Sequence, residues 1–409
     1  MRSSFRVFLA LAAVALSTTS IAHAQEQSIT TTPAVPTPAE AAATVEPSPG
    51  GSWTGLPLFS YAPETQFAFG GFGVHYFRLG SAPSEARASY LALAAMYTTR
   101  SQALVDFMPV FWFGPPLSDE ERTQALRDIA RSALSDSDRM RKFERFSITG
   151  QFSYRRMPES FFGVGNNTNL ANEEMYTLHS FWDLLDFRVR IRGPFFLGLR
   201  QEFQVQEILD TRSGGLLQNG VTGAEGGMRS GLGITLVWDS RDNTQSARNG
   251  GFHQMSLVTF QPGLGSAWTY THFNLDLREY VQVAPKHVLA FQFYADLNFG
   301  DVPFNQLAQL GGVSRLRGYY EGRYRDEDYI MAQAEYRVMP IVWRLGAVVF
   351  AAVGEVSDRL RNFRLDGLRW AAGAGIRFAL DTTERIHVRI DLGCSPDGCS
   401  PYVNVLEAF

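Results

Sequence analysis

Apolar and polar residues alternate with a period of two through segment after segment of this chain. In residues 287–299 the apolar positions are Leu289, Phe291, Phe293, Ala295, Leu297 and Phe299, and mostly polar residues lie between them. The same alternation occupies residues 267–283, 327–339, 367–380 and 385–393. Because successive side chains of a β-strand point to opposite faces, the pattern predicts strands with one apolar and one polar face. Such strands fit either a soluble sandwich of two sheets or a barrel whose outer wall contacts lipid.

Sixteen segments carry a strand pattern, and a closed antiparallel bacterial barrel requires an even number. They are residues 56–62, 66–78, 88–99, 102–113, 144–156, 174–191, 195–209, 229–240, 251–261, 267–283, 287–299, 327–339, 344–355, 367–380, 385–393 and 400–409. Their spacing suits strands of about ten residues tilted across a bilayer. We therefore predict an all-β fold, a transmembrane antiparallel β-barrel of sixteen strands.

The composition is consistent with this fold and excludes one class of partner. Aromatic residues make up 13% of the chain, which contains 31 Phe and 37 Gly, as suits strands that face lipid on one side. A soluble sandwich has a similar composition. The net charge of −4 over 409 residues offers no electrostatic basis for binding nucleic acid.

The N-terminus has the layout of a secretory signal peptide. Two arginines precede an apolar run at residues 7–16, and small residues before Gln25 offer a cleavage site at Ala24. The run is too short to span a bilayer, and no Cys stands at the cleavage site as in a lipoprotein. We expect residues 1–24 to be removed on export. The remainder lacks any run of about twenty apolar residues, so it enters a membrane only as a barrel, in the bacterial outer membrane.

Two segments depart from the strand pattern. Residues 25–52 are rich in Thr, Ala, Pro and Glu without any aromatic residue, which predicts a disordered linker ahead of a barrel at residues 53–409. Residues 117–142 are charged, with apolar residues at helical spacing: Ala125, Leu126, Ile129, Ala133 and Leu134. We expect a short helical insertion there, which either packs on the barrel rim or docks a partner or the membrane surface.

A long loop rich in Gly and Arg separates the strands predicted at 287–299 and 327–339. Residues 310–326 read Leu-Gly-Gly-Val-Ser-Arg-Leu-Arg-Gly-Tyr-Tyr-Glu-Gly-Arg-Tyr-Arg-Asp. Several arginines in one loop need acidic or aqueous surroundings, because a desolvated charge without a partner is unstable. The polar face of a barrel lumen would supply them.

Four residues of this loop, Leu316-Arg317-Gly318-Tyr319, resemble the Arg-Gly-aromatic motif of the BamA/TamA outer-membrane assembly superfamily, which includes the bacterial surface antigen family. Three further segments resemble family features in the same order along the chain: the barrel start at 61–64, a Gly-x-Gly-Asn turn at 161–166, and a strand ending in an Asp-Arg turn at 233–243. The resemblance implies a sixteen-stranded outer-membrane barrel with the motif on a sixth external loop that folds into the lumen. Family members normally carry POTRA domains before the barrel. Residues 25–52 are too few to form one, so the chain is identified as a barrel-only member.

The resemblance also implies partners for Arg317. In the superfamily the motif arginine pairs with a Glu on the next strand and an Asp on the one after. Glu335 stands at the Glu position, on the face of its predicted strand that points into the lumen. Ala352 stands where the family has Asp. Asp391 and Asp296 are the candidate substitutes for the missing acid. The pairing either anchors a plug loop or takes part in opening the barrel.

Two features lie near the C-terminus. Cys394 and Cys399 flank a Pro-Asp-Gly turn, which in an exported chain predicts a disulfide; a metal site would need two more ligands, and no His lies nearby. Phe409 ends the last predicted strand on the same face as Val403 and Val405. It resembles the C-terminal assembly signal of outer-membrane barrels, although Glu407 stands where an apolar residue is usual. The implied partners are outer-membrane lipids and the barrel-assembly machinery during biogenesis.

Catalytic and cofactor motifs are not found in the sequence. It has no His-Glu-x-x-His, no Gly-x-Ser-x-Gly, no Walker loop and no paired zinc-type Cys motifs. We therefore expect no enzymatic activity, no cofactor and no metal.

Two function classes remain open. The first is an assembly or translocation barrel that inserts or moves protein or lipid, with a separate periplasmic chain as receptor. The second is a passive pore or structural barrel that has lost insertase activity. The shared motifs favour the first class, whereas the missing receptor domains and Ala352 favour the second.

Overall fold

The computed structural model describes residues 52–79, 88–115, 144–382 and 385–409, with a few positions between 118 and 124. The expected signal peptide, most of the linker and most of the helical insertion at 117–142 lie outside the described residues, so these three remain predictions. No helix among the described residues has the length and apolar character needed to cross a membrane.

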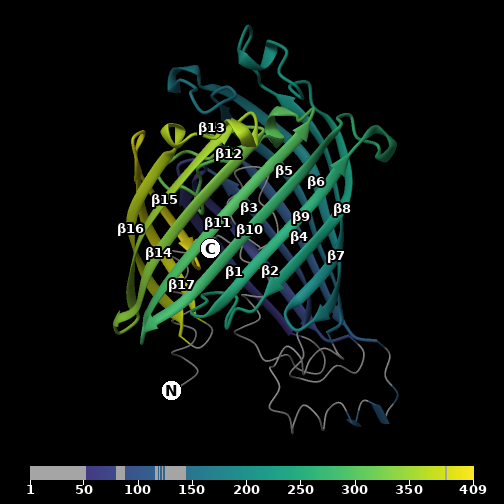
Figure 1. Ribbon diagram of the computed structural model, residues 1–409, viewed down its shortest axis with the longest axis vertical. Helices are drawn as coiled ribbons and strands as arrows, with labels where there is room; N and C mark the ends of the chain where they lie inside the picture. Colours follow the sequence, from purple (N-terminus) through teal and green to yellow (C-terminus); the bar gives the residue numbers. More distant parts are fainter. Residues whose placement is uncertain are drawn as a thin grey trace.

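Sixteen antiparallel strands close into a barrel (Figure 1), as the strand count predicts. The barrel strands are β1 (Ser52–Ala62), β2 (Gln66–Phe77), β3 (Ser89–Thr98), β4 (Ala103–Phe113), β5 (Phe146–Phe161), β6 (Glu174–Arg192), β7 (Phe195–Leu209), β8 (Gly227–Asp239), β9 (Gly250–Phe260), β10 (Tyr270–Ala284), β11 (His287–Gly300), β14 (Asp328–Val342), β15 (Leu345–Ser357), β16 (Arg369–Asp381), β17 (Ile386–Ser395) and β18 (Gly398–Val405). Each pairs with its neighbour in sequence, and β18 returns to β1.

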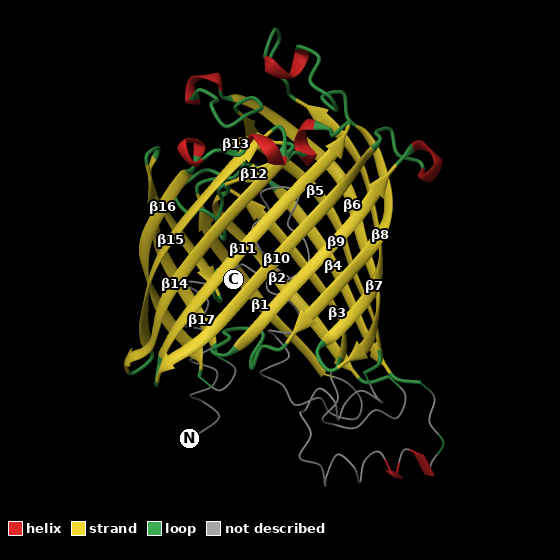
Figure 2. Cartoon of the chain, viewed as in Figure 1, coloured by secondary structure: helices red, strands yellow, loops and turns green. Residues whose placement is uncertain are grey.

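Small elements lie in the connections, where the sequence pattern gave no signal. Short strands β12 (Ala308–Leu310) and β13 (Tyr324–Asp326) pair with each other inside the β11–β14 connection. Single turns of 3₁₀ helix, shown red in Figure 2, are η3 (Leu170–Asn172), η4 (Leu216–Gln218), η5 (Pro262–Leu264), η6 (Phe304–Gln306), η7 (Leu360–Asn362) and η8 (Leu365–Gly367). All six occupy the end of the barrel with the long connections, which we call the long-loop end.

The wall follows the alternation that the sequence predicts for most strands. Apolar side chains such as Phe291, Val349 and Ile376 are exposed on the outer face, as lipid contact requires. The inner face carries buried polar groups, for example the ion pair between Arg200 and Asp186. The inner faces of β1–β4 differ, because a buried cluster there is mainly apolar: Leu58, Ala68, Phe72, Val74, Tyr76, Tyr90, Ala92, Ala94, Met96, Leu104, Met108 and Val110.

The junction between β1 and β18, which we call the seam, is the weakest strand pairing in the wall. Its register contains a single aligned pair, Tyr61 with Val403, whereas β1 aligns with β2 along its whole length. Each missing ladder hydrogen bond removes roughly 0.5–1.5 kcal/mol of net stabilisation, so the barrel opens at the seam at lower cost than elsewhere.

The end of β18 corrects one prediction. The strand predicted at 400–409 ends at Val405, and Leu406 adopts a left-handed φ of 67°. This turn directs residues 406–409 out of the sheet and into the barrel, where Ala408 and Phe409 pack with Ala247, Tyr280 and Ala290. Phe409 therefore does not share the outer face of Val403. Sequence alternation missed the turn because a left-handed Leu gives no pattern signal.

Candidate functional site

The candidate site is the connection between β11 and β14, residues 301–327, which we call loop 6, together with the wall it contacts. The loop folds back so that Leu316, Arg317 and Tyr319 are buried. Leu316 and Tyr319 join an apolar cluster with Tyr294, Met331 and Ala352 from the strands. Ala352 thus contributes apolar packing at the position where the family resemblance implied an acid.

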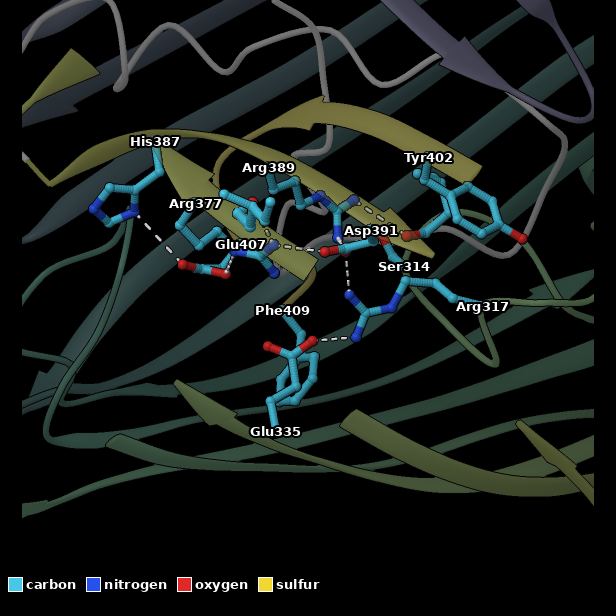
Figure 3. Close-up of polar contacts among 12 residues, drawn as sticks. Ser314, Arg317, Glu335, Arg377, His387, Arg389, Asp391, Tyr402, Glu407 and Phe409 are labelled. Carbon is cyan, nitrogen blue, oxygen red and sulfur yellow. Dashed lines mark hydrogen bonds and ion pairs between the residues drawn. The ribbon is translucent and has the colours of Figure 1, made fainter. Parts of the chain in front are cut away.

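Arg317 contacts two carboxylates from different strands (Figure 3). Its guanidinium donates to Glu335 on β14 and to Asp391 on β17, and all three side chains are fully buried. The guanidinium carbon also lies 3.6 Å from the ring centroid of Phe350, a cation–π distance. A planar guanidinium with separate donors suits two acids and a ring at once, which an ammonium group would not.

Asp391 and Glu335 extend this contact into a charged network. Asp391 also accepts from Arg377 at 2.5 Å and lies 3.5 Å from Arg389, while Glu335 accepts from Arg337 at 2.7 Å. The network alternates cations with anions, so each buried charge has a partner of opposite sign. Removing one partner of such a pair typically costs about 3–5 kcal/mol.

Glycines on β16 make room for the network. A Cβ on Gly373 would lie 2.4 Å from the Phe350 ring, and one on Gly375 would lie 1.9 Å from an oxygen of Asp391. The Phe350 ring and the Asp391 carboxylate therefore occupy space that any other residue would fill. This explains how an acid on β17 reaches an arginine that also binds Glu335 on β14.

The third candidate partner, Asp296, does not contact Arg317 in the structure. It lies on β11 and accepts from Nε2 of His272 at 3.0 Å. The alternation of the sequence predicts that Asp296 and Asp391 both face the lumen, but only the position of loop 6 decides which of them contacts Arg317. Asp391 is the second acidic partner of Arg317.

The backbone of the Arg-Gly-Tyr motif packs on the hairpin of β17 and β18. Gly318 has a φ of 123°, and a Cβ there would lie 2.9 Å from the backbone of Cys394. Its amide donates to Tyr402 Oη at 2.9 Å, and Ser395 Oγ donates to its carbonyl at 3.0 Å. Both the left-handed φ and the close approach require Gly at this position.

The disulfide predicted between Cys394 and Cys399 is present in this hairpin. The two residues face each other across β17 and β18, next to the turn that joins them. The bridge therefore holds the hairpin on which Gly318 rests.

The C-terminal segment, residues 406–409, joins the network from the opposite side. Glu407 accepts from Arg377 at 2.8 Å and lies 3.8 Å from Arg337. Arg337 also donates to the backbone oxygen of Phe409 at 2.9 Å and lies over its ring. Sequence reasoning missed this role; the one signal was Glu407 itself, an acid where an assembly signal has an apolar residue.

No group of three or more His, Cys, Asp or Glu side chains in the described part of the chain is arranged to hold a metal ion. The ion pairs of Arg317, Arg337 and Arg377 with Glu335 and Asp391 form a network that holds loop 6 inside the barrel. The sixteen-stranded barrel and the buried Arg-Gly-Tyr loop are the features that the resemblance implied, and they place the chain with the Omp85-type outer-membrane barrels.

Comparison with known families agrees with this class. The model of the Omp85 superfamily domain matches residues 132–385, more than half of the chain, so the chain belongs to the Omp85 superfamily. The proteins of this superfamily with such barrels are outer-membrane proteins. The described residues contain the barrel without a POTRA domain. No curated protein sequence matches the chain.

Solved structures show the same fold at low sequence identity. BamA from Haemophilus ducreyi lacking POTRA domains 1–3 is 11% identical with a TM-score of 0.56, covering 88% of this chain and 70% of that one. CdiB from Acinetobacter baumannii is 8% identical (TM-score 0.51), covering 87% of this chain and 59% of CdiB. CdiB from Escherichia coli is 10% identical (TM-score 0.51), covering 86% and 61%. The chain thus spans less than two thirds of either CdiB.

Proposed function

We propose that this barrel inserts or translocates protein or lipid at the outer membrane by opening the seam between β1 and β18. The observation that carries the proposal is the single aligned pair in the seam, Tyr61 with Val403, in a wall whose other neighbours pair over long registers. A client strand or a lipid needs a wall that parts at one defined place. The seam supplies that place at the lowest cost in lost hydrogen bonds.

The Arg317 network supports this proposal because it holds loop 6 beside the seam. Asp391, which contacts Arg317, lies on β17, and Tyr402, which contacts Gly318, lies on β18, the last strand before the seam. Glu335 lies on β14, farther around the wall. Loop 6 therefore connects the two strands nearest the seam on one side with a strand farther around the wall.

Export and partners complete the proposal. A signal peptide cleaved near Ala24 would deliver the chain to the periplasm, where the barrel-assembly machinery would fold it with Phe409 as part of the signal. Outer-membrane lipids surround the exposed apolar wall. A separate periplasmic chain would present the client.

A disulfide lock across the seam tests the proposal. Tyr61→Cys with Val403→Cys would bridge the aligned pair, and Phe69→Cys with Tyr97→Cys is the matched control, an aligned outward pair in the ordinary β2–β3 ladder. In liposomes, the oxidised seam lock should abolish insertion of an unfolded outer-membrane client, and reductant should restore it. The oxidised control should remain active.

The same experiment separates the alternative of a passive pore or structural barrel. A pore would conduct small ions at equal rates with the seam locked or free, and neither form would insert a client. That result would reject the insertion function and leave the barrel as a pore.

A further inference from the structure

Loop 6 contacts both flanks of the seam at the long-loop end of the barrel. The amide of Gly318 donates to Tyr402 Oη on β18 at 2.9 Å. Three positions later, the amide of Glu321 donates to Glu64 Oε1, in the turn between β1 and β2, at 2.8 Å. The loop therefore crosses from one side of the seam to the other within four residues.

The contact with the β17–β18 hairpin is extensive. The backbones of Arg317 and Gly393 lie so close that a Cβ on Gly393 would be 2.4 Å from the Arg317 carbonyl oxygen. Arg323 adds an ion pair with Asp397 in the hairpin turn at 3.1 Å. This flank is held by both backbone packing and charge.

The contact with the β1–β2 turn depends on one carboxyl group. Glu64 is buried, and its own carbonyl oxygen accepts from Gln102 Nε2 at 3.2 Å and from Arg100 Nη1 at 3.4 Å. Arg100 also donates to Tyr320 Oη of loop 6 at 3.4 Å. The loop is thus fastened to the first strands mainly through the Glu64 side chain.

We propose that loop 6 is a strap that holds the seam closed, and that the burial of the Glu64 carboxyl group against the loop makes this hold weaken as external pH rises. With only one aligned pair between β1 and β18, the strap supplies a connection between the flanks that the strand ladder lacks. The inference deepens the proposed function, because it names what holds the same seam closed. It rests on that function only for the reason why the seam opens.

The charges around the two carboxyls explain the direction of the pH effect. Burial raises the pKa of Glu64 to about 7, opposed by the Glu321 amide and by Arg100. Burial, followed by the charge of Glu64, raises the pKa of Glu321 to about 8; Glu159 adds to this, and Arg315 and Arg155 oppose it. The hydroxyls of Tyr320 and Tyr402 also face Glu64.

The sign follows from the proton count. In a released strap both carboxyls would be solvated and would ionise near the ordinary value of 4.5. The closed form keeps its protons to higher pH than the open form does. The contribution of these protons to the stability of the closed form is therefore complete below pH 4.5, and it is lost as pH rises through about 7 and about 8. Within this window each pH unit lowers the closed-to-open ratio by up to about tenfold per proton released.

Amide hydrogen exchange on the full mature protein in detergent micelles tests the strap. Glu64→Gln with Glu321→Gln keeps an oxygen acceptor for the loop amide but removes both titrations. Glu207→Gln, at an exposed carboxyl group on β7, is the control. Comparing variants at the same pH cancels the base catalysis of exchange. Between about pH 6 and about pH 9, wild type and the control should gain up to about a thousandfold more exchange in 52–62 and 311–323 than the double variant, about tenfold from Glu64 and about a hundredfold from Glu321.

Gly318→Ala provides a second, pH-independent measurement. The added methyl group would meet the Cys394 backbone, so this variant should exchange faster in 311–323 even at about pH 6, without unfolding the wall. Equal pH dependence in wild type and the double Gln variant would overturn the pH inference. Unchanged exchange of 52–62 and 398–405 in Gly318→Ala would overturn the strap.

The outcomes are distinguishable from those of the client assay. If the barrel never inserts a client but shows the pH-dependent exchange, the strap is supported and the proposed function is rejected. If the barrel inserts clients but shows no pH-dependent exchange, only the strap is rejected.

Discussion

Replacing Asp391 by Ala should destabilise the barrel more than any other single change in the Arg317 network. Asp391 contacts three arginines, Arg317, Arg377 and Arg389, each no more than 1% exposed. Its loss removes one carboxylate partner from three buried guanidinium groups at once, for which about 3–5 kcal/mol is expected. Glu335→Ala should cost about 2 kcal/mol, because Arg317 keeps Asp391 and Arg337 keeps Glu407.

The loss is measured by the temperature or urea concentration at which the unboiled protein no longer migrates as a compact barrel on a gel. External protease added in parallel reports whether loop 6 is released. Asp186→Ala is the matched control, because its buried ion pair with Arg200 joins two neighbouring strands of the wall, β6 and β7. The control should lower stability to a similar extent while loop 6 stays protected.

A double-mutant cycle decides whether Arg317 and Asp391 act as a pair. Arg317→Ala should also lower stability and expose loop 6, and the double variant should be little worse than Asp391→Ala alone. Fully additive effects, or an Asp391→Ala protein as resistant as wild type, would refute the reasoning and mean that another group holds the loop.

Three further outcomes are expected. The protein should fractionate with the outer membrane and migrate differently before and after boiling, because a closed barrel resists detergent; full-length soluble recovery from the periplasm would contradict this. Replacing Cys394 and Cys399 by Ser should lower the free energy of unfolding by roughly 2 kcal/mol, the loop-closure value for a ring of about six residues, whereas free thiols in unreduced protein would contradict the bridge. Glu407→Gln should lower the free energy of unfolding by about 2 kcal/mol, because Arg377 and Arg337 lose a charged acceptor. An unchanged urea midpoint would show that the Glu407 contacts do not stabilise the barrel.

Local pattern allowed most of the barrel to be predicted from the sequence. The alternation in 287–299 and 385–393 corresponds to β11 and β17 within a residue or two. The strand predicted at 144–156 ended too early, because β5 continues through Pro158 to Phe161. Pairing with β6 along that whole length, down to Phe161 with Glu174, overrides the local signal of a proline.

The sequence by itself determined the alternating strands, their even number, the Cys394–Cys399 bridge and the Arg-Gly-Tyr motif, because each is written in residues that are adjacent or nearly so. Only the tertiary structure decided that Asp391 rather than Asp296 contacts Arg317, and that Glu64 meets Glu321 across 257 positions. It also decided that Phe409 turns into the lumen. These contacts depend on the register of the whole closed wall and on where one long loop lies within it, and no local pattern encodes either.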